Sequence, residues 1–201
     1  MITPATSEIE HKQLLLVEGK DDEGFFQELR HRHGISSLQI ENYEGKNNLR
    51  AYLHTLRERP RFEILERIGI TRDADESKES AKQSVYNALS KENLPLPGEQ
   101  PNDAPIVSVL ILPPERNTGC LETLIWESIE TTTNANCIRE FVDCINARSS
   151  ENLRTKAKVH AYIAAQSKPG LKIGEATKAG YWDLGHPAFD SVTAFLRGLA
   201  A

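Results

Sequence analysis

Cysteine and long apolar runs are scarce in this sequence, and each scarcity excludes a class of protein. The three cysteines, Cys120, Cys137 and Cys144, form no Cys-x-x-Cys pair and no His/Cys zinc spacing. Cys137 and Cys144 are seven residues apart on an expected helix, about 10 Å along its axis, which is too far for a disulfide. We therefore predict three reduced cysteines in the core.

No apolar run approaches the roughly 20 residues of a membrane-spanning helix. The segment from Met1 to Lys12 lacks the apolar centre of a signal peptide. These two absences predict a cytoplasmic protein. The sequence also has no Walker A pattern G-x-x-x-x-G-K-[ST], which excludes a P-loop ATPase within this chain.

An excess of basic charge is missing as well. The chain has 24 Lys and Arg against 29 Asp and Glu, a net charge of -5, which argues against a broad basic surface for non-specific nucleic-acid binding. A metal-dependent site that receives phosphates through an ion stays compatible with this balance. At 39% hydrophobic and 26% charged residues, the chain is typical of a globular protein with a sizeable core.

Strand-like and helix-like segments alternate through the first 113 residues. Such alternation is typical of a parallel, doubly wound sheet. Four prolines mark residues 95–105 as a loop. The apolar runs predict strands at 14–18, which we expect to be buried on both faces, and at 38–43, 63–72 and 107–112. Between them we predict helices from Asp21 or Asp22 to about Arg32, from Asn47 or Asn48 to about Leu56, and from Ser77 to about Glu92.

The rest of the chain is predicted to be helical. We expect an α/β core over residues 1–130 and a helical C-terminal extension over residues 131–201 that packs on the core. The segments with helical spacing are 120–130, about 135–148, 151–166 and 189–199.

Carboxylates follow the first and third expected strands. Glu18 ends the first run with Asp22 four residues on, and Asp73 and Asp75 end the third run. Because side chains alternate along a strand, Asp73 and Asp75 would point to the same side, beyond the carboxyl ends where such sheets bind ligands. Like charges about 4 Å apart cost on the order of 4 kcal/mol at an effective dielectric near 20. A divalent cation or a shared proton removes this cost, so the placement favours a metal site.

Plainer roles remain open for some of these acids. Asp22 and Asp75 can simply serve helix starts, where acids satisfy backbone N–H groups and the helix dipole. Glu122 is either a fifth carboxylate at the same edge of the sheet or the N3 partner of a helix N-cap at Gly119.

Two lysines raise a similar choice. Lys156 and Lys158 are either a solvated helix face, or one of them reaches over the acids and stabilises charge on a phosphate. Being two residues apart on a helix, they face different directions and cannot both serve.

Two known α/β classes also place acids at strand ends, but both fit less well. A phosphoaspartate receiver domain has an acidic pair after strand one, and a strand-five lysine followed by proline that is not found here. A haloacid-dehalogenase-like phosphatase carries Asp-x-Asp after its first strand, whereas here the motif follows the third.

A glutamate after strand one and Asp-x-Asp after strand three resemble the Toprim domain, the metal-binding module of topoisomerases, DnaG-type primases, recombination-mediator proteins and overcoming-lysogenization-defect (OLD) nucleases. The segment Val17-Glu18-Gly19-Lys20-Asp21-Asp22 looks most like the nuclease branch. The length, the GCLE segment (119–122) and the KAKVHAYIA segment (156–164) are similar to a bacterial family of Toprim-like proteins known as DUF3226. The similarity runs from about residue 12 to the C-terminus.

The resemblance implies a Toprim-like, Rossmann-like α/β fold that binds one or two Mg²⁺ or Mn²⁺ ions, which suits all-oxygen ligands. Glu18 would also act as general acid/base, and Lys156, or failing it Lys158, as a transition-state lysine. The implied metal ligands are Glu18, Asp22, Asp73, Asp75 and Glu122.

The function implied by the resemblance is hydrolysis of phosphodiester bonds in DNA or RNA. A separately encoded ABC-type ATPase acting in phage defence is the implied partner. No tyrosine-bearing breakage domain and no zinc module is present, so a complete topoisomerase or primase is excluded. The alternative is a regulatory or binding subunit of a nucleic-acid-processing complex that keeps the fold and the ion without turnover.

Overall fold

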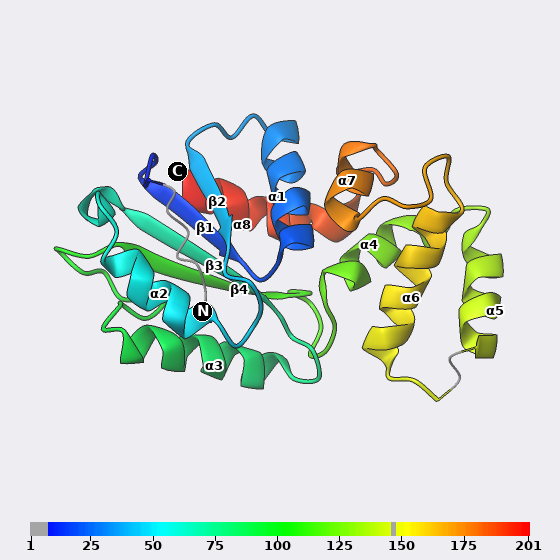
Figure 1. The fold of residues 1–201 in the computed structure, drawn as a ribbon, viewed down its shortest axis with the longest axis horizontal. Coiled ribbons are helices and arrows are strands. Elements are labelled where there is room, and N and C mark those ends of the chain that lie inside the picture. Colours follow the sequence, from blue (N-terminus) through cyan, green and yellow to red (C-terminus); the bar gives the residue numbers. More distant parts are fainter. Residues whose placement is uncertain (1–7, 146–147) are drawn as a thin grey trace.

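The computed structural model describes residues 8–145 and 148–201, and within them four parallel strands form one sheet in the order β2-β1-β3-β4. Helices cover both faces of the sheet (Figure 1). The predicted α/β class, a small parallel sheet flanked by helices, is confirmed. The strands are β1 (Gln13–Val17), β2 (Leu38–Asn42), β3 (Arg67–Asp73) and β4 (Ile106–Leu112). The helices are α1 (Lys20–Arg32), α2 (Leu49–Arg57), α3 (Lys78–Lys91), α4 (Leu121–Ile129), α5 (Ala135–Ile145), α6 (Glu151–Ala164), α7 (Ile173–Lys178) and α8 (Asp190–Ala200).

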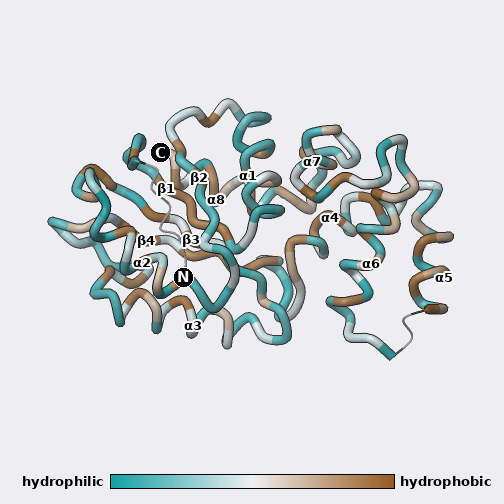
Figure 2. The backbone as a smooth tube through the Cα atoms, viewed as in Figure 1, coloured by the Kyte–Doolittle hydropathy of each residue, from teal (hydrophilic) through white to brown (hydrophobic). Residues whose placement is uncertain are grey.

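The strand β1 is buried on both faces, which explains its unbroken apolar sequence. Leu14 and Leu16 belong to the core that α2 and α3 cover. Leu15 and Val17 belong to the opposite core, shared with α1, α4 and α8. Figure 2 shows apolar residues running along the strands between these two helical layers.

The order of the strands creates a crevice at one end of the sheet. From β1 the chain crosses to β2 on one side, and β3 then returns to the other side of β1. Such a reversal opens a crevice beyond the carboxyl ends of the two strands. The ends of β1 and β3 therefore mark where a ligand is expected.

The C-terminal helices pack on this frame in three places. The helix α8 lies against β3 and β4, α7 lies against α1, and α5 and α6 form a pair that contacts α4 through α6. The division at residue 130 stays a prediction. No helix within the described residues is long and apolar enough to cross a membrane.

Several element boundaries differ from the predicted ones. The strand β3 begins at Arg67 instead of residue 63, because residues 62–64 form a 3-10 turn. The helix α1 begins at Lys20, with Gly19 as its N-cap, and the six-residue helix α7 was not predicted. Of the helix predicted for 135–148, α5 is seen to Ile145, and residues 146–147 lie outside the described residues. Residues 1–7, within the segment inspected for a signal peptide, lie outside them too.

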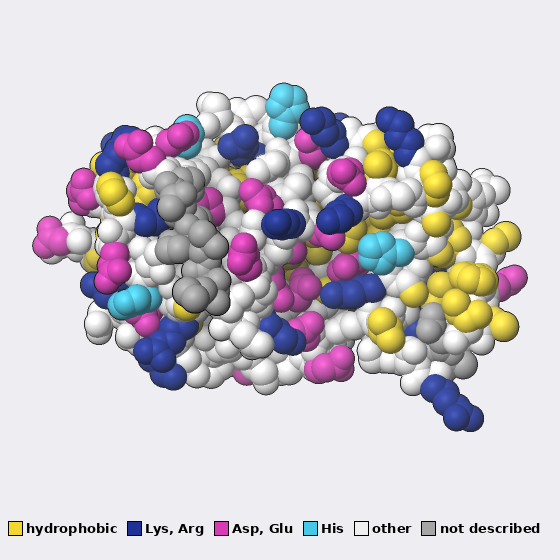
Figure 3. All heavy atoms as spheres, in the orientation of Figure 1, with side chains coloured by type: hydrophobic (Ala, Val, Ile, Leu, Met, Phe, Trp, Pro, Cys, Tyr) yellow, Lys and Arg dark blue, Asp and Glu magenta, His cyan; other side chains and the backbone are white. Residues whose placement is uncertain are grey.

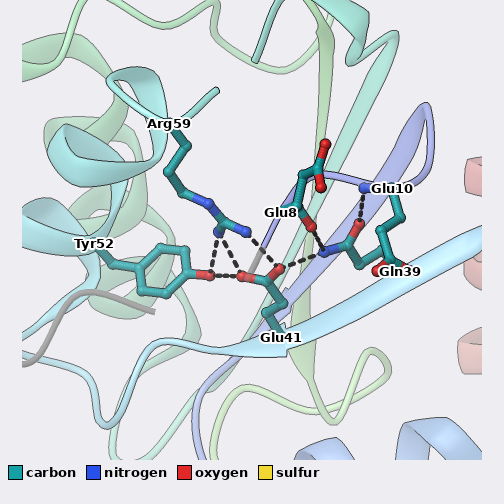
Figure 4. A network of polar contacts seen from close by, with 6 residues as sticks. All are labelled: Glu8, Glu10, Gln39, Glu41, Tyr52 and Arg59. Atoms are coloured by element: carbon teal, nitrogen blue, oxygen red, sulfur yellow. Dashed lines mark hydrogen bonds and ion pairs between the residues drawn. The ribbon is translucent and has the colours of Figure 1, made fainter. Parts of the chain in front are cut away.

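A buried ion pair fastens α2 to the edge strand β2 (Figure 4). Both oxygens of Glu41 accept hydrogen bonds from the Arg59 guanidinium, at 2.7 and 3.0 Å, and Tyr52 donates its hydroxyl to the same carboxylate. Burial alone would raise the pKa of Glu41, but the donors from Arg59 and Tyr52 outweigh it and lower the pKa. Gln39 extends the network to the backbone of Glu8 and Glu10.

Close contact between α1 and α7 gives a testable consequence. A Cβ added at Gly24 would lie 2.6 Å from the Cα of Gly174, so the Gly24→Ala variant must push two backbones apart. We expect it to lower the free energy of unfolding by 1–3 kcal/mol or more, as overpacking does. The matched change Gly198→Ala, in α8 with open space at the Cβ position, should instead raise it by up to about 1 kcal/mol. Urea unfolding of both variants measures these changes. If both variants changed the free energy of unfolding in the same direction, the close contact between α1 and α7 would be contradicted.

Candidate metal centre

Carboxylates from four elements converge beyond the carboxyl ends of β1 and β3. Glu18 directly follows β1, Asp73 is the last residue of β3, and Asp22 and Glu122 lie in the first turns of α1 and α4. With Lys156 of α6 they line a cavity of about 290 Å³, here called the carboxylate cavity. Figure 3 shows Asp and Glu side chains gathered in the middle of this face, beside several Lys and Arg side chains.

The start of α1 holds Asp22 in place. Its Oδ2 accepts a hydrogen bond from the backbone N–H of Gly19 at 3.1 Å, so Asp22 does serve the helix start, as the plainer interpretation expected. A carboxylate has two oxygens with about four acceptor sites. Capping therefore leaves capacity for a second partner in the carboxylate cavity, which Asp22 also lines.

The start of α4 positions Asp73 and Glu122 together. Asp73 Oδ1 accepts from the backbone N–H of Leu121 at 3.0 Å, which ties the end of β3 to this helix. The N-cap of α4 is Cys120 and its N3 residue is Thr123. The interpretation of Glu122 as the N3 partner of a cap at Gly119 is therefore wrong, and the largely buried Glu122 faces the cavity.

Asp75 lies differently from Asp73. The strand ends at Asp73, and Asp75 has a φ of 50° and forms an isolated antiparallel bridge with Gly119. The expectation that strand alternation points both side chains the same way is therefore wrong. Asp75 Oδ2 accepts from Lys46 Nζ at 2.7 Å, and Asp75 is not among the residues lining the carboxylate cavity. It stays close enough to Glu18 for its charge to raise the pKa of that group.

Burial and mutual repulsion raise the pKa of three carboxylates of the site, Glu18, Asp22 and Asp73. Burial, followed by the charges of Glu122 and Glu18, raises the pKa of Asp22 to about 7. Burial and then the charges of Asp22 and Glu122 raise the pKa of Asp73 well above 3.8. The pKa of Glu18 is raised mainly by burial and then by Asp75, against an opposing effect of Arg72. The cluster therefore holds all its charges at neutral pH only at a large cost, which a cation or a shared proton relieves.

The ligand atoms fit a hard divalent cation. Oxygens of Asp73 and Glu122 and the sulfur of Cys120 all lie within 4.8 Å of one another, a grouping that can hold a metal ion. Glu18 Oε2 is buried and has no hydrogen-bond partner among the described residues, so it lacks the partner that buried oxygens normally have. Sulfur is a poor ligand for a hard cation, and burial raises the pKa of the Cys120 thiol, so the thiol keeps its proton in the metal-free protein. The carboxylate oxygens that remain suit Mg²⁺ or Mn²⁺.

The two lysines of α6 have different surroundings. Lys156 Nζ lies 3.9 Å from Glu122 Oε1. Burial lowers the pKa of Lys156, but the negative charges of Glu122 and Asp73 outweigh it, and the net pKa is raised. Lys158 is buried with its Nζ 5.5 Å from the ring centre of Trp126, so the solvated-face interpretation is wrong for Lys158. Lys156 is the one that faces the acids.

Sequence reasoning missed two neighbours of the site and misjudged two cysteines. Lys46 pairs with Asp75, and its position just after the second expected strand was a signal that it belongs near the site. Cys120 lies two positions before the predicted acid Glu122, with only Leu121 between them. Cys137 and Cys144 are free but exposed, so the prediction of core cysteines holds only for Cys120.

Metal binding should be visible as stabilisation. An ion that binds only the folded state at 100 times its Kd adds about 2.7 kcal/mol, which raises the melting temperature of a chain of this size by roughly 5–10 °C. We expect this rise with Mn²⁺ relative to EDTA, and much less of it in Asp73→Asn. Because Asn keeps the acceptor for Leu121 and removes a repelling charge, Asp73→Asn should also melt higher than wild type in EDTA at pH 8. Equal melting temperatures of the wild type in EDTA and in Mn²⁺ would contradict metal binding by the carboxylates.

The raised pKa of Asp22 predicts the pH dependence of the metal-free protein. The folded state binds the extra proton, so stability is fully present below the unfolded pKa near 3.8 and is lost as pH rises toward about 7. The corresponding energy is at most about 4 kcal/mol. Asp22→Asn removes this loss, so its advantage over wild type in EDTA should grow between pH 4 and 8. If the difference in stability between Asp22→Asn and wild type did not change with pH, the raised pKa of Asp22 would be contradicted.

Comparison with solved structures gives low similarity. Three chains, each the C-terminal region of the OLD protein of Xanthomonas campestris pv. campestris, align over 94% of this chain and 94–96% of their own length. Their sequence identities are 14%, 17% and 13%, and the TM-scores are 0.43, 0.44 and 0.42. Similarity at this level is too low to carry an argument about function.

Comparison at the level of families is decisive. No curated protein matches the chain. One family model matches residues 12–201, nearly the whole sequence, and its start agrees with the predicted start near residue 12. The chain belongs to the family DUF3226, described as proteins of unknown function.

Proposed function

We propose that this protein is a Mg²⁺- or Mn²⁺-dependent nuclease of the Toprim type, which hydrolyses phosphodiester bonds in DNA or RNA. The observation that supports it most is the convergence of Glu18, Asp22, Asp73 and Glu122, faced by Lys156, on one cavity at the reversal of strand order. Helix capping by these acids would explain neither the buried oxygen of Glu18 that lacks a hydrogen-bond partner nor the lysine opposite the acids.

The residues of the cavity divide into three roles. Asp22, Asp73 and Glu122 would bind the cation. Its positive charge would offset the repulsion that raises the pKa of the two aspartates. When bound there, a divalent cation supplies Lewis-acid polarisation of a phosphate oxygen. Glu18, whose pKa is raised mainly by burial, is suited to hold or pass a proton. Lys156, cationic and 41% exposed, can contact a non-bridging phosphate oxygen as its charge increases.

Partner and location are proposed on the resemblance to Toprim nucleases. A chain with a net charge of -5 attracts nucleic acid weakly, so a partner that delivers the substrate would make up for this. We propose a separately encoded ABC-type ATPase acting in phage defence as that partner, in the cytoplasm. A regulatory subunit that binds the ion without turnover is the outcome if purified protein with Mn²⁺ cleaves nothing.

Activity should depend on the central acids. Asp73→Asn and Glu18→Gln should each abolish Mn²⁺-dependent cleavage of a plasmid or RNA substrate while leaving circular dichroism unchanged. Asp21→Asn is the control, since Asp21 borders the cavity but is not among the main charges that shift the pKa of Glu18, Asp22 or Asp73. If Asp21 were essential and Asp22 dispensable, the assignment of the first motif would be off by one residue.

The role of Lys156 is tested against its neighbour on the same helix. Removing one charge-stabilising donor commonly costs about 3–4 kcal/mol of barrier, so Lys156→Ala should lower kcat by a factor of about 10²–10³. Mn²⁺ binding should persist, as measured by calorimetry. Lys158→Met keeps the packing on Trp126 and should leave kcat nearly unchanged. Equal, small effects of both changes would remove Lys156 from the mechanism.

A further inference from the structure

A polar groove runs between α2 and α3 on the sheet face opposite to α1. It has a volume of about 530 Å³ and is here called the α2–α3 groove. Three of its ten lining residues are cations, most others carry amides or hydroxyls, and none is a carboxylate. The lining residues are Lys46, Asn47, Leu49, Arg50, Ser80, Gln83, Ser84, Asn87, Ala88 and Lys91.

The absence of carboxylates from this lining is unusual for the chain. Acids outnumber Lys and Arg by 29 to 24 over the whole sequence, yet this surface presents Lys46, Arg50 and Lys91 without one. Arg50 donates through Nε to the buried Glu92, while 60% of the Arg50 side chain is exposed. The groove lining is therefore richer in cations than the chain as a whole, with Arg50 and Lys46 each paired to a carboxylate that lies outside the lining.

Lys46 joins the groove to the carboxylate cavity. Its ammonium bonds Asp75 at 2.7 Å, and the charges of both residues act on the pKa of Glu18. Gly45, the residue before Lys46, lines the carboxylate cavity itself. A long ligand lying in the groove would therefore lead directly to the acids.

We propose that the α2–α3 groove binds the phosphodiester backbone of a nucleic-acid duplex and guides it to the carboxylate cavity. This inference rests on the proposed nuclease function. Ammonium, guanidinium, amide and hydroxyl groups are the donors that contact phosphates without reading sequence. No aromatic side chain lines the groove, whereas proteins that bind unpaired strands typically stack bases on aromatic rings. The substrate is therefore a paired backbone, recognised without regard to sequence.

The length of the groove matches several phosphates. Along α3 the lining extends from Ser80 to Lys91, roughly 16 Å at 1.5 Å per residue. A duplex strand carries one phosphate per about 3.4 Å of axis but also winds around that axis, so successive phosphates lie farther apart than this and only a few can lie along the groove. Arg50 and Lys91 lie in the part of the groove away from the acids.

The salt dependence of binding tests the groove without requiring cleavage. Binding of a 30-base-pair duplex to the protein is measured in EDTA at several salt concentrations. In the wild type, each cation–phosphate contact adds about -0.9 to the slope of log K against log salt. Lys91→Gln should reduce that slope by about 0.9, and Arg50→Gln/Lys91→Gln by about 1.8. Lys82→Gln is the control, because Lys82 is also on α3 but lies over Tyr86 and does not line the groove. Its slope should equal that of wild type.

A second measurement separates the groove from the proposed chemistry. The small diester bis(p-nitrophenyl) phosphate can reach the acids without touching Arg50 or Lys91, so the double variant should hydrolyse it with Mn²⁺ at the wild-type rate. On the duplex the same variant should lose at least about tenfold in kcat/KM, as expected when two phosphate contacts are removed.

Unchanged salt slopes in the Lys91 and double variants overturn the groove. A loss confined to unpaired oligonucleotides overturns the duplex assignment. Failure of wild type to hydrolyse either substrate overturns the nuclease function, and the EDTA binding data still decide the groove.

Discussion

Repulsion among buried carboxylates is the constraint on which this structure depends. Asp22, Asp73 and Glu18 each have a raised pKa, and in every case burial is the largest cause and a neighbouring carboxylate the next. Folding alone gains nothing from such an arrangement, since one protonated or substituted acid would be more stable. Its presence at the end of a well-packed sheet is the main support for the proposed cation.

The surrounding fold holds these charges in place at fixed points. The turn of α1 holds Asp22 through Gly19, and the start of α4 holds Asp73 through Leu121. The two cores, one on each face of the sheet, fix the directions of β1 and β3, which end at the site. Asp75 is paired with Lys46 and does not line the carboxylate cavity, so the negative charge of the cavity comes from the other acids of the site.

The sequence carried enough information for the frame and for most of the site. The unbroken apolar run of β1 and the alternation of strands and helices predicted the parallel sheet, and acids placed after strands predicted which residues would meet. Positions that depend on single backbone angles could not be predicted: the left-handed φ of Asp75 ends the alternation after Asp73. Lys46 and Lys158 show the same limit, because a lysine's partner depends on which helix packs beside it.

Anomalous diffraction from crystals grown with Mn²⁺ tests the central claim most directly, since it locates the ion without reference to activity. The account predicts a manganese peak in the carboxylate cavity, with oxygens of Asp73 and Glu122 about 2.1 Å from it and Glu18 or Asp22 completing the protein ligands. The peak should vanish in Asp73→Asn crystals. A cavity without a peak at saturating Mn²⁺, or a peak bound only by Asp75 after displacement of Lys46, would contradict it.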